Sequence, residues 1–162
     1  MTLARRHGGW VIALSFIAAL MLTIVPLPSW AGFLRPEWVA MVLVYWCIAL
    51  PQRVGVFTGW TMGLLMDVLV GSVLGQHALG LSVVAYLALK LHRRIRNFPL
   101  WQQALTVLLL ITFHKLLTAW VNGITGQPLQ SALYWASPVV SMLLWPAMFL
   151  LLRGTRRRFR VT

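Results

Sequence analysis

Six long apolar segments, separated by short polar stretches, take up most of this 162-residue chain. They run over residues 10–25, 36–50, 54–74, 77–91, 100–121 and 134–152. A helix needs about 20 apolar residues to cross a bilayer, with a range of about 17–25; the shorter second and fourth segments would require a thinner bilayer or flanking residues. The pattern predicts an all-α membrane protein, a bundle of six transmembrane helices forming one integral membrane domain over residues 1–162. A re-entrant second segment would give five spans instead.

The composition excludes an ordinary soluble domain. Hydrophobic residues make up 60 % of the chain and charged residues 10 %, against about 25 % charged residues in soluble domains. A net charge of +12 can indicate a nucleic-acid surface, but such a surface needs basic residues spread over a water-facing fold. Here the Lys and Arg residues form short clusters between apolar segments. We therefore expect a lipid bilayer, and no nucleic acid, as a partner.

The basic clusters all fall on one side of the predicted membrane. If the N-terminus is cytoplasmic, 12 of the 14 Lys and Arg residues face the cytoplasm. They are Arg5, Arg6, Arg53, Lys90, Arg93, Arg94, Arg96, Arg153, Arg156, Arg157, Arg158 and Arg160. Arg35 then lies outside and Lys115 lies within the fifth segment. This arrangement meets the positive-inside rule at every loop, whereas five spans would place a basic cluster outside. The sequence predicts a multi-pass protein with cytoplasmic N- and C-termini.

A column of glycines runs through the third segment, whose core reads GWTMGLLMDVLVGSVLG. Counting by fours gives Gly55, Gly59, Gly63, Asp67, Gly71 and Gly75. Residues four apart lie nearly above one another on a helix, and small residues at this spacing let a second helix approach closely. The column predicts a helix-docking interface that includes Asp67. The docked helix belongs either to the same chain or to another protein.

Asp67 is one of only two acidic residues in the chain. A carboxylate in hydrocarbon costs at least about 2.5–3.5 kcal/mol, so Asp67 should face protein and have a partner. Asp67 and Lys115 lie at similar depths, about 20 Å from the cytoplasmic ends of their segments at ~1.5 Å per residue. We therefore predict that Asp67 pairs with Lys115. His114 is next to Lys115 in the sequence, so a proton pathway through Asp67, His114 and Lys115 is a further interpretation. The lack of other intramembrane acids disfavours it.

The other acid, Glu37, belongs to a span-start motif, Arg35-Pro36-Glu37. Proline suits the first turn of a helix, and a carboxylate there is stabilised by the helix dipole. The two acids lie in different segments, and no serine has an acid–base pair near it in sequence, so we expect no catalytic residues and no enzyme activity. The lone cysteine, Cys47, excludes a cysteine-based metal cluster, and we expect no metal and no cofactor.

The motifs RPEWV, ALPQRVG and GLLMDVLVGSVLG, followed by LWQQALTVLLL and LLWPAMFLLLR, resemble the MreD family of rod shape-determining membrane proteins over nearly the full length. The resemblance implies a non-enzymatic subunit of the cell-elongation machinery in the bacterial inner membrane. It further implies action with MreC, RodA, the elongation transpeptidase and, indirectly, the MreB filament in control of peptidoglycan synthesis and cell shape. The implied fold is similar to the substrate-binding subunits of energy-coupling-factor transporters.

Two other functions remain open at this stage. A vitamin-binding transporter subunit would have a similar fold but needs an outward pocket with several convergent polar groups. The predicted outer ends offer Arg35, Glu37, His77, Asn122, Gln127 and Gln130. A proton-coupled channel or transporter would need more intramembrane charge than this chain has.

Overall fold

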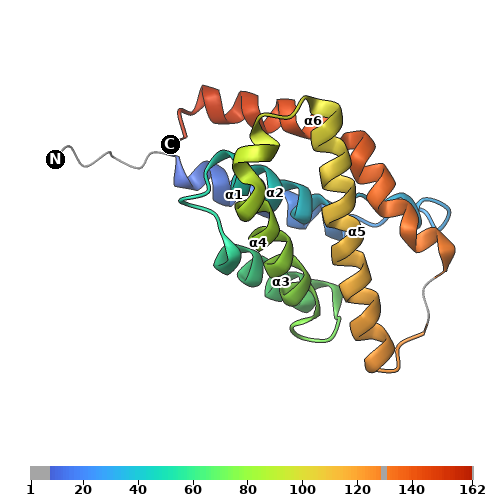
Figure 1. The fold of residues 1–162 in the computed structure, drawn as a ribbon. Helices are drawn as coiled ribbons and strands as arrows, with labels where there is room; N and C mark the ends of the chain where they lie inside the picture. The colour runs from blue at the N-terminus through green and yellow to red at the C-terminus, as the bar shows by residue number, and fades with distance from the viewer. Residues whose placement is uncertain (1–7, 129–130, 162) are drawn as a thin grey trace.

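A computed structural model describes residues 8–128 and 131–161. Within these ranges it contains six α-helices: α1 (Gly9–Ile24), α2 (Trp38–Ala49), α3 (Val56–Val70), α4 (Gln76–Arg96), α5 (Leu100–Ile124) and α6 (Ala136–Arg158). Two 3-10 turns, η1 (Gly32–Leu34) and η2 (Ala132–Trp135), precede α2 and α6. The all-α prediction is therefore confirmed (Figure 1). The helix ends differ most from the predicted segments in three places: α3 ends at Val70 rather than at residue 74, α4 continues to Arg96 rather than 91, and α6 continues to Arg158 rather than 152.

Among the described residues, two helices are long and apolar enough to cross a membrane by length and composition. They are α5 and the stretch Ala132–Arg158, which contains η2 and α6. The helices α1, α2 and α3 are apolar but shorter, at 10–17 residues each, and α4 ends in a basic turn. A span for each of the six helices therefore stays a prediction.

Helix α2 is the centre of the bundle. Its residues are buried continuously from Val39 to Ile48, and it packs against each of the other five helices. A helix that is hydrophobic all round has no face suited to water, which explains why this short segment takes the central place. The remaining helices surround it, with α3 against α4, α4 against α5 and α5 against α6.

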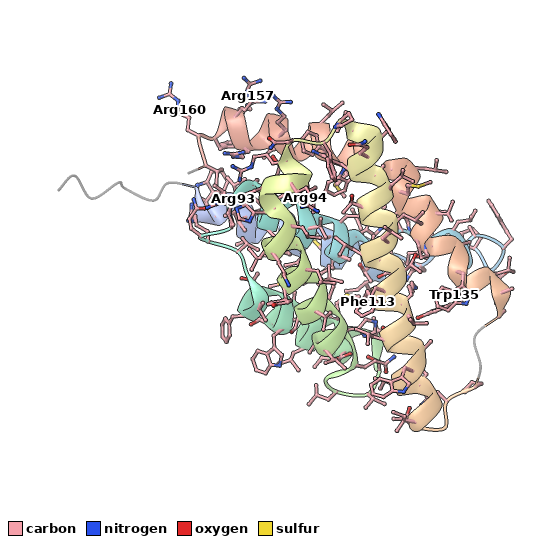
Figure 2. All side chains as sticks on the ribbon, viewed as in Figure 1. Arg93, Arg94, Phe113, Trp135, Arg157 and Arg160 are labelled. Carbon is pink, nitrogen blue, oxygen red and sulfur yellow. The ribbon has the colours of Figure 1, made fainter. Side chains whose placement is uncertain are left out.

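The bundle has two chemically different ends. We call one the basic end, formed by the starts of α1, α3 and α5 and the ends of α2, α4 and α6. Every Lys and Arg of the described residues lies near it except Arg35 and Lys115. Figure 2 shows Arg93, Arg94, Arg157 and Arg160 on this side of the molecule, away from Trp135. We call the other the distal end, where α1 and α5 finish and α2, α4 and α6 begin.

Candidate functional site

The glycine column of α3 packs against α4 of the same chain. Gly59 and Gly63 are buried. A Cβ added at Gly59 would lie 2.7 Å from the carbonyl oxygen of Leu81, and one at Gly63 would overlap the backbone of Ala78. Since carbon atoms in contact are about 3.5–4.0 Å apart, neither position has room for a side chain. The helix that fills this part of the predicted groove is therefore α4.

The column does not continue to Gly71 and Gly75 as predicted, because α3 ends before them. Gly71 has φ +74° and Gly75 has φ +98°, with nothing within 4 Å of a Cβ at either position. These glycines supply left-handed backbone conformations, Gly71 at the end of α3 and Gly75 before α4. Their role is in the α3–α4 turn rather than in helix docking. Gly55 lies at the start of α3, where a Cβ would be 3.4 Å from the Leu89 side chain.

Asp67 organises this turn. It is 1 % exposed, and its carboxylate accepts hydrogen bonds from the Ser72 hydroxyl (2.8 Å), the Gly75 N–H (2.8 Å) and the His77 N–H (2.9 Å). The Nδ1 atom of His77 lies 2.8 Å from the same carboxylate. Backbone N–H groups at the start of a helix have no partner within the helix. Asp67 supplies that partner for α4, and so links the end of α3 to the start of α4.

The predicted pair between Asp67 and Lys115 is wrong, because Lys115 binds the other acid. The Lys115 Nζ atom lies 2.7 Å from Oε1 of Glu37, and these side chains are 13 % and 16 % exposed. Lys115 also lies over the ring of Tyr134, 4.2 Å from its centroid. The depth argument placed Lys115 correctly near the distal end. It failed to identify the partner because the central helix α2 begins there and presents Glu37 to α5.

The span-start motif connects three helices. Glu37 directly precedes α2, and its backbone N–H donates to the Ser141 hydroxyl of α6 at 2.9 Å. The Arg35 guanidinium donates to the carbonyls of Thr23 (2.5 Å) and Val25 (2.7 Å) at the end of α1. Carbonyls at the end of a helix lack partners and carry negative partial charge. The motif therefore fastens α1 and α6 to the start of α2.

Two adjoining polar cavities open at the distal end, with volumes of about 470 and 200 Å³. His77, Lys115 and Tyr134 line both of them. Of the outer polar residues named from the sequence, Arg35, Glu37, His77, Asn122 and Gln127 line one or both, and Gln130 lies outside the described residues. Gln76 and Tyr134 were missed, because neither belongs to a recognisable sequence pattern.

His114 does not line these cavities. It is 2 % exposed, and a Cβ on Gly80 would overlap its Nδ1 atom, so its imidazole packs directly against α4. Its ring centroid lies 5.8 Å from that of His77. The glycine at position 80 therefore makes room for the imidazole, a contact that counting by fours along the third segment could not find.

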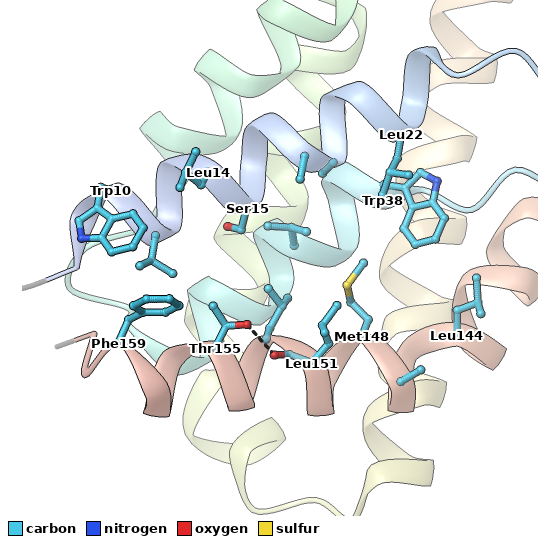
Figure 3. Close-up of a pocket in the computed structure, with 16 residues that line it drawn as sticks. Trp10, Leu14, Ser15, Leu22, Trp38, Leu144, Met148, Leu151, Thr155 and Phe159 are labelled. Carbon is cyan, nitrogen blue, oxygen red and sulfur yellow. Dashed lines mark hydrogen bonds between the residues drawn. The ribbon is translucent and has the colours of Figure 1, made fainter.

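An apolar groove of about 780 Å³ runs between α1 and α6 (Figure 3). Both helices pack on α2, which contributes Trp38 and Val42 to the lining. At the basic end the groove is closed by Trp10 and Phe159, whose ring centroids are 5.0 Å apart. Alanines on both walls, Ala18 of α1 and Ala147 of α6, keep it open. Sequence reasoning missed this groove because its walls come from the first and last helices.

Comparison with known proteins identifies the family. The sequence profile of the rod shape-determining protein MreD matches residues 4–155. The chain belongs to the MreD family. It is 36 % identical over 157 residues to the rod shape-determining protein MreD of Haemophilus influenzae, covering 94 % of each chain. No solved structure matches the chain significantly, so the similarity in fold to energy-coupling-factor subunits stays a prediction.

Membership of the MreD family gives the chain a role in cell shape and directs attention to surfaces that other molecules can reach. Gly59 and Gly63 are covered by α4, so this part of the glycine column is not such a surface. The groove between α1 and α6 is different, because Leu14 and Leu151 on its walls are 52 % and 65 % exposed. With a volume of about 780 Å³ and an apolar lining, this groove is a surface that a partner of the MreD-family chain can reach.

Proposed function

We propose that this MreD-family chain is a non-enzymatic, multi-pass subunit of the bacterial inner membrane with cytoplasmic termini. In this proposal it binds a membrane-embedded helix of MreC in the groove between α1 and α6. Through MreC it supports the peptidoglycan synthesis enzymes, RodA and the elongation transpeptidase, and indirectly the MreB filament. The role of the chain is to hold these partners in place rather than to catalyse a reaction.

The groove is the observation that carries this proposal. Helices in a bilayer associate mainly through close packing, because lipid tails are as apolar as the helices themselves. Small residues favour such packing, and the walls of this groove present Ala18 and Ala147 between large side chains such as Leu14 and Leu151. An apolar helix is the occupant that matches a long groove with an apolar lining.

The test is co-purification of MreC with the tagged full-length chain from membranes of cells that produce both. Ala18→Leu and Ala147→Leu fill the groove from opposite walls. Overpacking costs about 1–3 kcal/mol, so each change should reduce MreC recovery by at least about fivefold at 1.4 kcal/mol per factor of ten. Ala13→Leu is the matched control, since Ala13 is an exposed residue of α1 outside the groove. Cells relying on either groove variant should become round.

Normal MreC recovery with both groove variants would show that the groove holds lipid tails instead. Reduced recovery with the Ala13 control as well would point to a general defect of α1 rather than to docking in the groove.

A second candidate function, vitamin binding for a transporter, rests on the two polar cavities at the distal end. Their combined lining brings Glu37, His77 and Lys115 together. From the sequence alone, these polar side chains could not be placed in one site. The test is extraction of the purified full-length chain with organic solvent. A stoichiometric small molecule in the extract, with lost uptake but unchanged cell shape on depletion, would favour this function over MreC binding.

A further inference from the structure

A separate pocket of about 240 Å³ lies at the basic end, between the ends of α2, α4 and α6 and the start of α5. Three arginines line it: Arg96 from α4, and Arg153 and Arg156 from α6. The tyrosine Tyr45 and the glutamine Gln103 complete its polar lining. Two helices far apart in sequence, α4 and α6, thus bring three positive charges to one small concavity.

The arginines of this pocket have no side-chain carboxylate to neutralise them. The chain has two acidic side chains, Glu37 and Asp67. Both lie toward the distal end, where Glu37 pairs with Lys115 and Asp67 accepts bonds from the start of α4. Three clustered guanidinium groups without a carboxylate repel one another. The pocket is therefore complementary to an anion from outside the chain.

The walls of the pocket hold Arg96 in place, because its guanidinium donates to the carbonyl of Ile48 at 2.6 Å. Arg156 shares the lining of the pocket with Tyr45. The amide of buried Gln103 donates to the carbonyl of Ile95 at 3.1 Å, which fixes α4 against α5. A guanidinium has five N–H donors, so each arginine retains donors for a ligand.

The position of the pocket indicates which anion it takes. Trp10 and Trp101, at the starts of α1 and α5, are 56 % and 63 % exposed, and exposed tryptophans favour the level of the lipid headgroups. The pocket lies at this same end of the bundle, and its remaining lining is apolar, from Ile48, Ala49 and Phe149. Arginine forks match phosphate oxygens in pairs, and basic pockets between transmembrane helices bind anionic headgroups.

We propose that this pocket binds the phosphate of an anionic phospholipid headgroup through Arg96, Arg153 and Arg156. The bound headgroup joins α4 to α6 at the basic end, and its tails lie along the apolar surface of the bundle. This site is separate from the groove between α1 and α6 and does not depend on the binding of MreC.

The test compares phosphatidylglycerol with phosphatidylcholine of the same tails, added to the full-length chain in detergent and detected by native mass spectrometry. We expect preferential binding of phosphatidylglycerol. At about 1 kcal/mol per basic residue near the surface, and 1.4 kcal/mol per factor of ten, each arginine contributes about fivefold. The double variant Arg153→Gln/Arg156→Gln should therefore lose roughly 25-fold in phosphatidylglycerol affinity.

The control is Arg157→Gln/Arg160→Gln, which removes the same charge from two exposed arginines outside the pocket; Figure 2 shows both side chains pointing away from the helices. It should stay within about threefold of the natural chain, since neither arginine lines the pocket and a charge that does not contact the headgroup is screened by salt. Equal losses of phosphatidylglycerol affinity in the two double variants would show only a general attraction between basic residues and anionic lipid, and would overturn the proposal. Phosphatidylcholine binding measures folding in each variant, because misfolded protein would lose both lipids.

Inorganic phosphate provides the second arm. If it displaces phosphatidylglycerol at concentrations comparable to those of the lipid, the pocket belongs to a soluble phosphate compound and the lipid assignment fails. Displacement only at a large molar excess supports the headgroup, because the tails then contribute to binding.

Discussion

Replacing Gly63 by alanine tests whether the contact between α3 and α4 determines the stability of the bundle. A Cβ at this position would lie 2.6 Å from the carbonyl carbon of His77 and closer still to the backbone of Ala78. Ordinary carbon contacts are about 3.5–4.0 Å. The helix α4 must therefore retreat by about 1 Å, and a gap of this size forfeits a quarter to a half of each contact it opens.

The magnitude follows from two opposing effects. Overpacking a close-packed interior costs about 1–3 kcal/mol, and the backbone of a helix cannot move aside as a flexible side chain does. Alanine is favoured over glycine in a helix by about 0.5–1 kcal/mol. We expect Gly63→Ala to lower the free energy of unfolding by about 1–2 kcal/mol. Gly63→Leu adds a full side chain at the same point and should prevent recovery of a folded protein.

Gly154→Ala is the matched control. Gly154 lies within α6, and a Cβ there meets nothing within 4 Å, so only the gain in helix propensity remains. The assay is thermal unfolding of the purified chain in detergent, followed by tryptophan fluorescence. A free-energy change of 1 kcal/mol shifts Tm by about 2–4 °C for domains of this length. The two variants should therefore differ in Tm by about 3–12 °C. Equal Tm values would refute the close packing of α3 on α4.

Two further predictions concern the buried charges. Glu37→Gln and Lys115→Gln should each destabilise the chain by about 3–5 kcal/mol, because each leaves its partner unpaired. The double variant should cost less than the sum of the two single losses. Additive losses in the same unfolding assay would mean that the two side chains act independently. Asp67→Asn should be better tolerated than Asp67→Leu, since asparagine keeps one acceptor oxygen for the N–H groups of the α3–α4 turn. Leucine leaves these donors unsatisfied, and a buried unsatisfied donor costs about 1–3 kcal/mol. Amide hydrogen exchange at His77 measures this difference, and equal protection in the two variants would contradict it.

The sequence was a reliable guide where local pattern decides structure. Six apolar segments became six helices, with α1 and α5 beginning within one residue of the predicted positions. The end of α3 was misplaced because apolar residues continue past Val70, while the backbone turns at Gly71. Hydrophobicity does not distinguish a glycine within a helix from one that ends it, although a left-handed φ does.

The partners of the charged residues were harder to predict. Depth along a helix can be counted from the sequence, and it placed Lys115 near the distal end. The direction that a helix faces depends on its neighbours, and α2 presents Glu37 to Lys115 while the α3–α4 turn encloses Asp67. The spacing of residues along the sequence therefore could not show which of the two acids pairs with Lys115.

The sequence by itself determined that this chain is helical, that its basic residues gather at one end and that its motifs are those of the MreD family. These properties depend on the order of residues and on interactions of each segment with water or lipid. Only the tertiary structure decided that α4 covers Gly59 and Gly63, that α1 and α6 enclose a groove, and that three arginines share one pocket. These features join residues far apart in sequence, and their positions follow from the packing of all the helices around α2.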